Sequence, residues 1–451
     1  MNLDRLKNKR ICFLGFGIEN QALLKFLLKN KVKADITVCD ARTITPSLRS
    51  FPSSRNTAGV GVREWRLGKN YDKDLEKYDI IFRIAGYPLF AKNIIKAMIK
   101  GVEIRSATKL FFDLCPTKNI IGVTGTKGKG TTASLIYAIL KSAFAKAAAD
   151  KDAKRKIYFG GNIGTPMFSF FDKIKTNDWV VLELSSFQLE DLRRSPRVAV
   201  FTNFFPDHLA AADPLNPNYH KNLITYWDAK ANIFSHQSPR NILIANKILC
   251  PEIERKRPRG KVIYFDKSNL KTPLIGEHNK RNIAAAALAA QAAGVSQKII
   301  AAAVKKFKGL EHRLEFVAAK NDARYYNDSF STAPDTAIIA IAAFRSHAII
   351  LIAGGSDKGS DFSALAGEIK KSVKYLILLP GKGTEKIKRA LKKIKYQNIG
   401  LAGNMAQAVE RAKKMSMAGD IILLSPACAS FGIFKNYKDR GAQFKKFTKL
   451  L

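Results

Sequence analysis

The stretch IIGVTGTKGKGTTAS at residues 120–134 contains the residue types that bind phosphate groups. An apolar run leads into glycines, then Gly128 and Lys129, and then hydroxyl residues that open an expected helix. Glycines let backbone N–H groups wrap phosphate oxygens, and the lysine places its charge on the β and γ phosphates. Val123 stands where the strict G-x-x-x-x-G-K pattern has its first glycine. An unrelated surface loop is the alternative, but the order strand, loop and helix favours a nucleotide site.

A second group of residues has the chemistry of a metal site. Glu183 lies in the otherwise apolar run WVVLELSS, where a carboxylate needs a cation or a hydrogen-bond donor. Mg²⁺ beside the phosphate loop would satisfy it, and a buried ion pair is the alternative. His208 follows an expected strand, and Lys230 lies on an expected helix among small and apolar residues. Such residues are normally structural or solvated, but a lysine with a lowered pKa can form a carbamate with CO₂, an acid-like metal ligand.

Polar residues near the ends of expected elements suit the rest of a nucleotide and a small carboxylate. Those suited to a purine, phosphates and a ribose are Asn279, His312, Arg313 and Asp328. Those that follow apolar strands and suit a carboxylate are Lys358, Ser430 and Tyr437. Taken singly, each residue of the first group would be interpreted as a cap or a surface polar group.

A weaker signal is the Gly15-Phe16-Gly17 turn after the first expected strand. Its backbone N–H groups could meet a phosphate, but a tight turn without a ligand is an equal alternative.

Strands that alternate with helices must position these residues, and this alternation predicts an α/β fold with parallel sheets. At roughly 150 residues per domain, 451 residues suggest about three domains. The expected strands are residues 10–17, 35–40, 79–86, 101–106, 119–125, 179–186, 198–205, 241–246, 261–266, 323–330, 347–355, 374–381, 398–403 and 420–426. The expected helices include residues 21–30, 91–100, 282–294 and one that begins at Pro334. Residues 142–156 are low in complexity and are expected to form a helix end and a loop.

Composition excludes several classes of protein. A hydrophobic content of 46% is enough for several buried cores, which argues against disorder. No run of apolar residues is long enough to span a membrane, and the N-terminus has no signal-peptide pattern. The five scattered cysteines form no CxxC pair and indicate reduced cytosolic thiols.

The net charge of +40 has two interpretations, a nucleic-acid partner or a lysine-rich composition with an anionic small-molecule substrate. The basic residues are spread along the chain and few aromatic residues lie among them, so we expect no nucleic acid.

The motifs occur together in an order that resembles the Mur ligase family over nearly the whole chain. They are VTGTKGK, GGNIGTP, LELSSFQLE, PDH, YWDAK, GEHNKRN, GLEHRLE, NDSFSTAP, GGSDKG and LSPACASF. LELSSFQLE and LSPACASF resemble the branch that adds D-glutamate. The DNPR signature of the branch that adds meso-diaminopimelate or lysine is missing.

The resemblance implies a three-domain Mur ligase architecture. Residues 1–113 would form a Rossmann-like domain for the UDP substrate, residues 114–310 a central P-loop-type ATPase domain, and residues 311–451 a Rossmann-like domain for the amino acid. It also implies that ATP phosphorylates the carboxylate of UDP-N-acetylmuramoyl-L-alanine and that the amine of D-glutamate attacks the acyl phosphate. We expect Mg²⁺ as cofactor, and a cytoplasmic monomer in peptidoglycan precursor synthesis.

The resemblance also assigns roles to individual residues. The catalytic residues would be Lys129, His208 and Lys230, with Lys230 carbamylated. The ATP-binding residues would be Gly125, Thr126, Lys127, Gly128, Lys129, Gly130, Thr131, Asn279, Arg313 and Asp328. The metal ligands would be Thr131, Glu183, His208 and Lys230. The UDP substrate would contact Phe16, Gly17, Ala41, Arg42, Asn162 and Ser185. The D-glutamate pocket would be Thr332, Lys358, Ser430 and Tyr437.

Four departures from the family pattern bear on these roles. Gly130 replaces the hydroxyl residue after the loop lysine, so Thr131 or a water must supply that metal ligand. Lys127 replaces the usual Asn and adds a charge near the phosphates. Phe330 stands where many relatives have Lys, and IAGYP at residues 84–88 replaces SPGIP, which puts uracil recognition in doubt.

Two other functions remain open at this point. One is an ATP-dependent amide ligase of the same superfamily with another amino acid or a lipid-linked acceptor. The other is a non-enzymatic nucleotide-binding or nucleic-acid-associated module, which the charge of +40 and Gly130 suggest.

Overall fold

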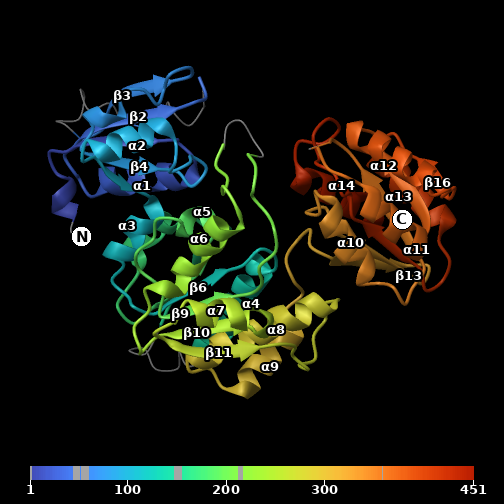
Figure 1. Ribbon diagram of the computed structural model, residues 1–451. Helices are drawn as coiled ribbons and strands as arrows, with labels where there is room; N and C mark the ends of the chain where they lie inside the picture. The colour runs from blue at the N-terminus through green and yellow to red at the C-terminus, as the bar shows by residue number, and fades with distance from the viewer. Residues whose placement is uncertain (1–2, 44–50, 52–59, 147–154, 212–216, 358) are drawn as a thin grey trace. The chain divides into compact units, whose positions relative to one another are not determined.

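The computed structural model describes residues 3–43, 51, 60–146, 155–211, 217–357 and 359–451. The chain divides into two compact units. The first comprises Met1–Ser268 and Arg281–Ala303, and the second comprises Asn269–Lys280 and Val304–Leu451. Figure 1 shows three separate sheets, in blue, green and orange to red, each with helices packed beside it.

The first sheet is wholly parallel, with strand order β3-β2-β1-β4-β5. Its strands are β1 Arg10–Leu14, β2 Asp35–Asp40, β3 Val62–Leu67, β4 Ile80–Arg83 and β5 Glu103–Arg105. Its helical segments are η1 Leu3–Leu6, α1 Ile18–Lys29, η4 Leu75–Lys77, α2 Lys92–Ile99 and α3 Ala107–Leu114. Alternate residues of the buried strand β1 contribute to two separate apolar clusters, so the sheet is covered on both faces.

The second sheet is also parallel, with order β11-β10-β9-β6-β8-β7. Its strands are β6 Ile120–Thr124, β7 Ile157–Gly161, β8 Trp179–Glu183, β9 Val198–Phe201, β10 Ile242–Asn246 and β11 Lys261–Phe265. The helical segments of this region are α4 Lys129–Lys146, η6 Met167–Ser169, η7 Phe171–Lys173, α5 Ser186–Leu189, α6 Leu223–Ser235, η8 Lys247–Leu249, α7 Cys250–Arg255, α8 Glu277–Ala292 and α9 Gln297–Lys306. The central strands β6, β8 and β9 are fully buried, as apolar strands covered on both faces must be.

The third sheet has the order β12-β13-β17-β14-β15-β16. All its pairs are parallel except β12 with β13. Its strands are β12 Glu315–Lys320, β13 Ala323–Asn327, β14 Ile349–Gly354, β15 Val373–Leu379, β16 Ile399–Leu401 and β17 Ile421–Leu424. Its helices are α10 Pro334–Ala342, α11 Ser363–Ser372, α12 Lys382–Lys393, α13 Met405–Met415 and α14 Tyr437–Leu450. Two apolar clusters cover its two faces.

The predicted α/β class with parallel sheets is confirmed, and each sheet falls within one of the three predicted domains. The domain boundaries themselves stay predictions. Three edge or near-edge strands, β3, β7 and β12, were not predicted. β3 carries exposed charged residues and β12 is only partly buried, so neither has the apolar run of a central strand. Residues 142–146 end α4, and residues 147–154 of the predicted loop lie outside the described residues.

Candidate active site

The predicted phosphate loop lies between β6 and α4 and has a conformation that requires glycine. Gly125 has φ +142° and Gly128 has φ +82°, both in the region that L side chains rarely adopt. A Cβ on Gly125 would lie 2.0 Å from the Thr202 hydroxyl oxygen. Lys129 is the first residue of α4, so the loop ends at a helix N-terminus, where backbone N–H groups favour anions.

Residues in the segment after β9 form hydrogen bonds and an ion pair with the phosphate loop. The Lys127 carbonyl accepts hydrogen bonds from Thr202 Oγ1 at 2.8 Å and Asn203 Nδ2 at 2.9 Å. The Lys127 backbone N–H donates to Asn203 Oδ1 at 2.8 Å, and Lys127 Nζ forms an ion pair with Asp207 at 3.1 Å. The extra lysine of the loop therefore has a carboxylate partner. Lys129 Nζ donates to the Thr126 carbonyl at 3.0 Å, inside the loop.

Glu183 ends β8, next to β6, and is buried with one oxygen that has no partner. Its Oε1 accepts from Asn162 Nδ2 at 2.8 Å, and the Asn162 backbone N–H donates to the Glu183 carbonyl at 2.8 Å. Among the described residues, Oε2 is buried without a hydrogen-bond partner. Ser185 lies two residues further on and caps α5 through a reciprocal pair of bonds with Gln188. Three predicted site residues, Asn162, Glu183 and Ser185, are thus adjacent.

Lys230 is almost completely buried on α6. Its Nζ donates to the Gly125 carbonyl at 2.8 Å and lies 4.7 Å from the centre of the Tyr226 ring. Burial is the main cause that lowers the pKa of Lys230 well below its ordinary value, and the Lys129 charge adds to this. A neutral amine is the form that reacts with CO₂, so the position has the chemistry that carbamylation needs.

His208 lies in the loop after β9 and has φ +56°. The residue is exposed, but its ring lies against the rings of Phe187 at 5.2 Å and Tyr226 at 6.1 Å. Partial desolvation lowers the pKa of His208, the Asp207 carboxylate opposes this, and the Lys230 charge adds to it. A neutral imidazole is the form that binds a metal.

The residues present fit a magnesium ion in part. The unpartnered Glu183 Oε2 is a hard oxygen ligand in a buried place, which favours Mg²⁺ there. Thr131 is buried in the first turn of α4, directly after Gly130. Across the described ranges, no group of three or more His, Cys, Asp or Glu side chains is placed to hold a metal. A full ligand set would therefore need hydroxyl, phosphate, water or modified-lysine oxygens.

At the first sheet, Asp40 organises the predicted UDP-substrate residues. Its carboxylate accepts from the Phe16 backbone N–H at 2.6 Å and from the backbone N–H and the Nε of Arg42 at 2.9 and 2.8 Å. The Phe16 ring is buried against Trp65, so only the backbone of Phe16 can meet a ligand. Gly17 is the residue before α1, and Ala41 lies between Asp40 and Arg42.

In the second unit, Asp328 follows β13 and is buried. It accepts hydrogen bonds from the hydroxyls of Ser331 and Ser425, the latter at 2.9 Å, and from the Leu314 backbone N–H at 3.2 Å. Burial raises the pKa of Asp328 to about 6, and the hydroxyl bonds oppose this rise. The neighbouring Arg313 guanidinium lies 3.7 Å from the centre of the Phe330 ring.

Phe330 therefore connects two predicted pockets. Its ring also meets the Tyr437 ring edge to face at 5.1 Å. Arg313 of the predicted ATP set and Tyr437 of the predicted D-glutamate set contact the same ring. Phe330, which departs from the family pattern, therefore contacts residues of both predicted pockets within the second unit.

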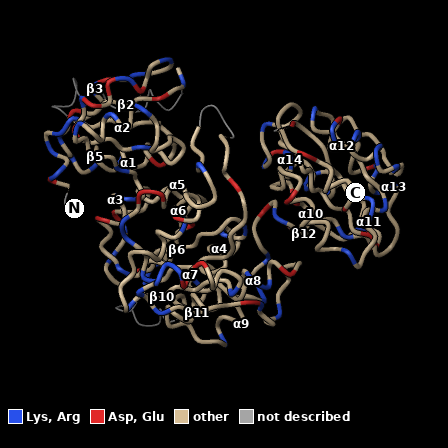
Figure 2. The backbone as a smooth tube through the Cα atoms, in the orientation of Figure 1, with Lys and Arg blue, Asp and Glu red and all other residues tan. Residues whose placement is uncertain are grey.

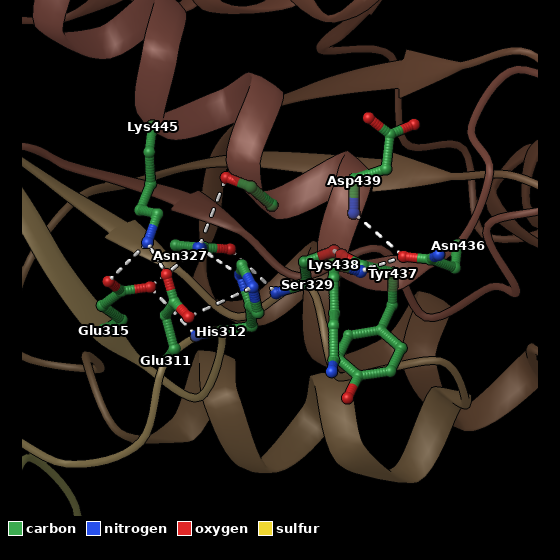
Figure 3. A network of polar contacts seen from close by, with 11 residues as sticks. Glu311, His312, Glu315, Asn327, Ser329, Asn436, Tyr437, Lys438, Asp439 and Lys445 are labelled. Carbon is green, nitrogen blue, oxygen red and sulfur yellow. Dashed lines mark hydrogen bonds and ion pairs between the residues drawn. The ribbon is translucent and has the colours of Figure 1, made fainter.

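A polar network around His312 and Asn327 holds the segment that contains Phe330. Figure 3 shows His312 directed toward Asn327, and Lys445 directed toward Glu311 and Glu315. Asn327 Nδ2 lies 2.9 Å from His312 Nδ1 and donates to Glu315 Oε2 at 3.0 Å. The Phe330 backbone N–H donates to the His312 carbonyl at 3.1 Å. This network joins the segments before and after β12 and β13 to α14.

The other predicted pocket residues are less closely connected. Ser430 is buried, one residue beyond a bridge between Ser356 and Ala429. Thr332 is half-buried before α10. Lys358 lies outside the described residues. Asn279 donates from Nδ2 to the Ile275 carbonyl at 2.7 Å. The predicted ATP residues are divided between the units, with the loop in the first and the rest in the second.

Several residues of these sites were missed by sequence reasoning. Tyr226 contacts Thr126 Oγ1 at 3.2 Å through its hydroxyl and lies four residues before Lys230, a spacing that one helix face could have revealed. The fully buried Arg440 donates to both oxygens of Ser329 and to the Cys428 carbonyl, and so ties two strand ends together. Nothing in the local sequence marked Arg440, because its partners come from distant segments.

Comparisons with known proteins place these features in a family. The model of the Mur ligase middle domain matches residues 123–257, and that of the Mur ligase glutamate ligase domain matches residues 312–428. The UDP-N-acetylmuramoylalanine--D-glutamate ligase of Clostridium acetobutylicum is 36% identical over 98% of this chain and 97% of that protein. The protein of the same name from Symbiobacterium thermophilum is 35% identical over 98% of each. This chain belongs to the Mur ligase family.

Solved Mur ligases share the fold. MurF ligase from Thermotoga maritima, determined in complex with ADP, has a TM-score of 0.59 at 15% identity and covers 100% of this chain and 97% of its own. UDP-N-acetylmuramate-alanine ligase MurC from the same organism has a TM-score of 0.55 at 18% identity, with coverages of 98% and 99%. The predicted family and architecture are confirmed.

Proposed function

We propose that this Mur ligase uses ATP to join D-glutamate to UDP-N-acetylmuramoyl-L-alanine in the synthesis of peptidoglycan precursors. The observation that carries the proposal is identity of 36% and 35%, over 98% of the chain, to two ligases with that name. Both matched family models fall on the segments that carry the candidate site, residues 123–257 and 312–428.

The proposed reaction has two steps. A carboxylate is a poor acyl donor because it has no leaving group. Its oxygen attacks the γ-phosphorus of ATP, ADP leaves, and an acyl phosphate forms. The amine nitrogen of D-glutamate then attacks the acyl carbon, a tetrahedral intermediate collapses, and phosphate leaves as the amide forms. Lys129, at the start of α4, would neutralise charge on the γ-phosphate during the first step.

The remaining proposed ATP contacts form a separate set in each unit. In the first unit they are Gly125, Thr126, Lys127, Gly128, Gly130 and Thr131. In the second unit they are Asn279, Arg313 and Asp328. The left-handed glycines and the helix N-terminus support the first group. The Asp328 carboxylate and the Arg313 guanidinium support the second, since they suit a ribose and a phosphate.

The proposed magnesium ligands are Thr131, Glu183, His208 and Lys230, with Lys230 as a carbamate. Bound Mg²⁺ would offset the negative charge that gathers on the phosphates and on the acyl group. The buried Glu183 Oε2, which has no hydrogen-bond partner among the described residues, supports Glu183 as one of these ligands. The burial of Lys230 and its lowered pKa support the modification.

The UDP substrate would lie against the backbone of Phe16 and Gly17, against Ala41 and Arg42, and against Asn162 and Ser185. The adjacency of Asn162 and Ser185 to Glu183 supports a substrate carboxylate near the metal.

D-Glutamate would contact Thr332, Lys358, Ser430 and Tyr437. A hydroxyl and a cation in this set suit the carboxylates of the amino acid.

We further propose that the enzyme works as a cytoplasmic monomer. The charge of +40 supports the monomeric state, because like charges oppose self-association. Light scattering at working concentration, with a mass of 50.0 kDa expected, is the measurement.

The function is tested by mass spectrometry of the nucleotide product. The purified protein is incubated with ATP, Mg²⁺ and UDP-N-acetylmuramoyl-L-alanine, and separately with D-glutamate, L-glutamate, D-alanine, L-lysine or meso-diaminopimelate. We expect product only with D-glutamate. Product with only another amino acid would support an amide ligase but refute D-glutamate as its substrate. No product with any of these amino acids would refute the enzymatic function.

A further inference from the structure

The strongest feature outside the candidate site is the exposed side of α2 in the first unit. Its buried side consists of Ile94 and Ala97. On the exposed side, Ile95, Met98 and Ile99 are 44%, 53% and 78% exposed. Large aliphatic side chains gathered on one exposed face are uncommon in a protein that presents this face only to water.

A row of lysines runs beside these aliphatic residues. Lys92, Lys96 and Lys100 are exposed and spaced four residues apart, so they lie one above another along the helix and its C-terminal end. Ile95 and Ile99 have the same spacing and form the adjacent row. A groove of about 270 Å³ runs between the two rows and is lined by these five residues.

The cations are only partly neutralised by the protein. Lys96 forms an ion pair with Glu76. Lys92 and Lys100 have no ion-pair partner among the described residues. A second hollow, of about 530 Å³, is lined by Lys100 together with Arg5 and Lys9.

The acids of that second hollow are already paired. Asp79 is paired with Arg10, and Glu103 with Arg105. Among the described residues, neither Arg5 nor Lys9 forms an ion pair within 4 Å, although the Lys9 charge acts on Asp79 from further away. Lys92 and Lys100 therefore add positive charge beside the exposed aliphatic row, and Arg5 and Lys9 add more in the hollow that shares Lys100 with it.

We propose that the exposed face of α2 is a docking surface for a lipid bilayer that contains anionic phospholipids. Aliphatic side chains would enter the boundary between headgroups and acyl chains, while lysines reach the phosphates, as amphipathic surfaces do. The helix has eight residues, too few to span a bilayer, so the protein would lie on its surface. Within the described residues no helix is long and apolar enough to cross a membrane.

Other occupants fit the chemistry less well. A second copy would bring two lysine rows together in a protein of charge +40. A protein partner is disfavoured because lysine is depleted in such interfaces. A nucleic acid would use the charge but leave the aliphatic row in water, since bases stack on aromatic side chains. Figure 2 shows lysine and arginine throughout the part of the chain that it colours, so charge alone does not single out α2. The feature that distinguishes α2 is an exposed aliphatic row beside a row of lysines.

The chain offers a matched control in α12. That helix carries exposed Lys392 and Lys393, but its aliphatic residues Ile387 and Leu391 are buried. A Lys392→Gln/Lys393→Gln variant removes the same charge as Lys92→Gln/Lys100→Gln without touching an exposed aliphatic row. Circular dichroism and thermal unfolding are used to check that each variant is folded.

The test is co-sedimentation of the full chain with vesicles of phosphatidylcholine alone or mixed equally with phosphatidylglycerol. We expect binding to the mixed vesicles only, weakened by salt. A lysine near an anionic surface contributes about fivefold, so Lys92→Gln/Lys100→Gln should weaken binding about 30-fold. Ile95→Ser/Ile99→Ser should weaken it by at least about tenfold, even at low salt.

Three results would overturn the proposal. The first is absence of binding to the mixed vesicles. The second is an equal loss in the α12 control, which would mean diffuse attraction by total charge. The third is unchanged binding by Ile95→Ser/Ile99→Ser, which would mean that the aliphatic row does not enter the bilayer. Ligase activity plays no part in the readout, so this proposal and the proposed reaction fail separately.

Discussion

Glu19 makes the stability of the first unit depend on pH in a way that one substitution can isolate. It is half-buried in the first turn of α1, and its carboxyl accepts a hydrogen bond from Gln188 Nε2. Burial raises the pKa of Glu19 from its ordinary 4.5 to about 7, and the bond from Gln188 opposes this rise. Between these values the folded protein keeps a proton that the unfolded chain has released. Stability is therefore lost as the pH rises from 4.5 to about 7, and the loss is complete above that.

The size of the effect follows from the two pKa values. The gap between 4.5 and about 7 corresponds to about 3 kcal/mol of unfolding free energy. Glu19→Gln is neutral at every pH and can still accept from Gln188. The variant should match the natural protein near pH 4.5 and exceed it by up to about 3 kcal/mol above pH 7.5. For a unit of the size of the first one, this corresponds to a rise of about 5 °C in melting temperature.

The assay is thermal unfolding of both proteins from pH 4.5 to 8.5, without ligands. Glu385→Gln on α12, where the carboxylate is 60% exposed, is the control for the loss of one surface charge. If the melting temperatures of Glu19→Gln and the natural protein differed by the same amount at every pH, the reasoning would be refuted. Because Glu19 lies at a helix N-terminus beside Gly17, Glu19→Gln should also lower the KM for the UDP substrate above pH 7.

Three further predictions concern the candidate site. Lys230→Ala should abolish turnover, and acetate or another small carboxylic acid should partly restore it; full activity of the variant would contradict a carbamate ligand. Gly125→Ala should destabilise the first unit by at least about 1–3 kcal/mol, because φ is +142° and the new Cβ would meet Thr202, and an unchanged melting temperature would contradict the loop geometry. Phe330→Ala should raise the KM for ATP about 5- to 30-fold. The substitution removes the ring contacts of Phe330 with Arg313 and with Tyr437, which together contribute about 1–2 kcal/mol. An unchanged KM would show that other groups hold Arg313 in place.

The sequence was sufficient for the central strands and for the phosphate loop. β6, β8 and β14 are fully buried and were predicted from their apolar runs. The edge strands β3 and β12 were not predicted. They are partly exposed and carry polar residues, and whether such residues form a strand depends on the neighbouring strands. The loop was predictable because its glycines and lysine are consecutive in the chain.

The contacts within the site were less predictable. Asp207 pairs with Lys127 across 80 positions, and Lys230 reaches the Gly125 carbonyl across 105. Such pairs follow from the order of strands in the sheet, which local patterns do not specify. The role of Phe330 is the clearest example. The sequence presented it as the loss of a lysine, whereas the structure shows its ring in contact with both Arg313 and Tyr437.

The central claim is tested most directly by phosphate release from ATP and Mg²⁺ with UDP-N-acetylmuramoyl-L-alanine, with and without D-glutamate. The account predicts sustained release only when both substrates are present, with one phosphate for each glutamyl residue gained by the nucleotide product. Release that ignores D-glutamate, or no release at all by a folded protein, would contradict it.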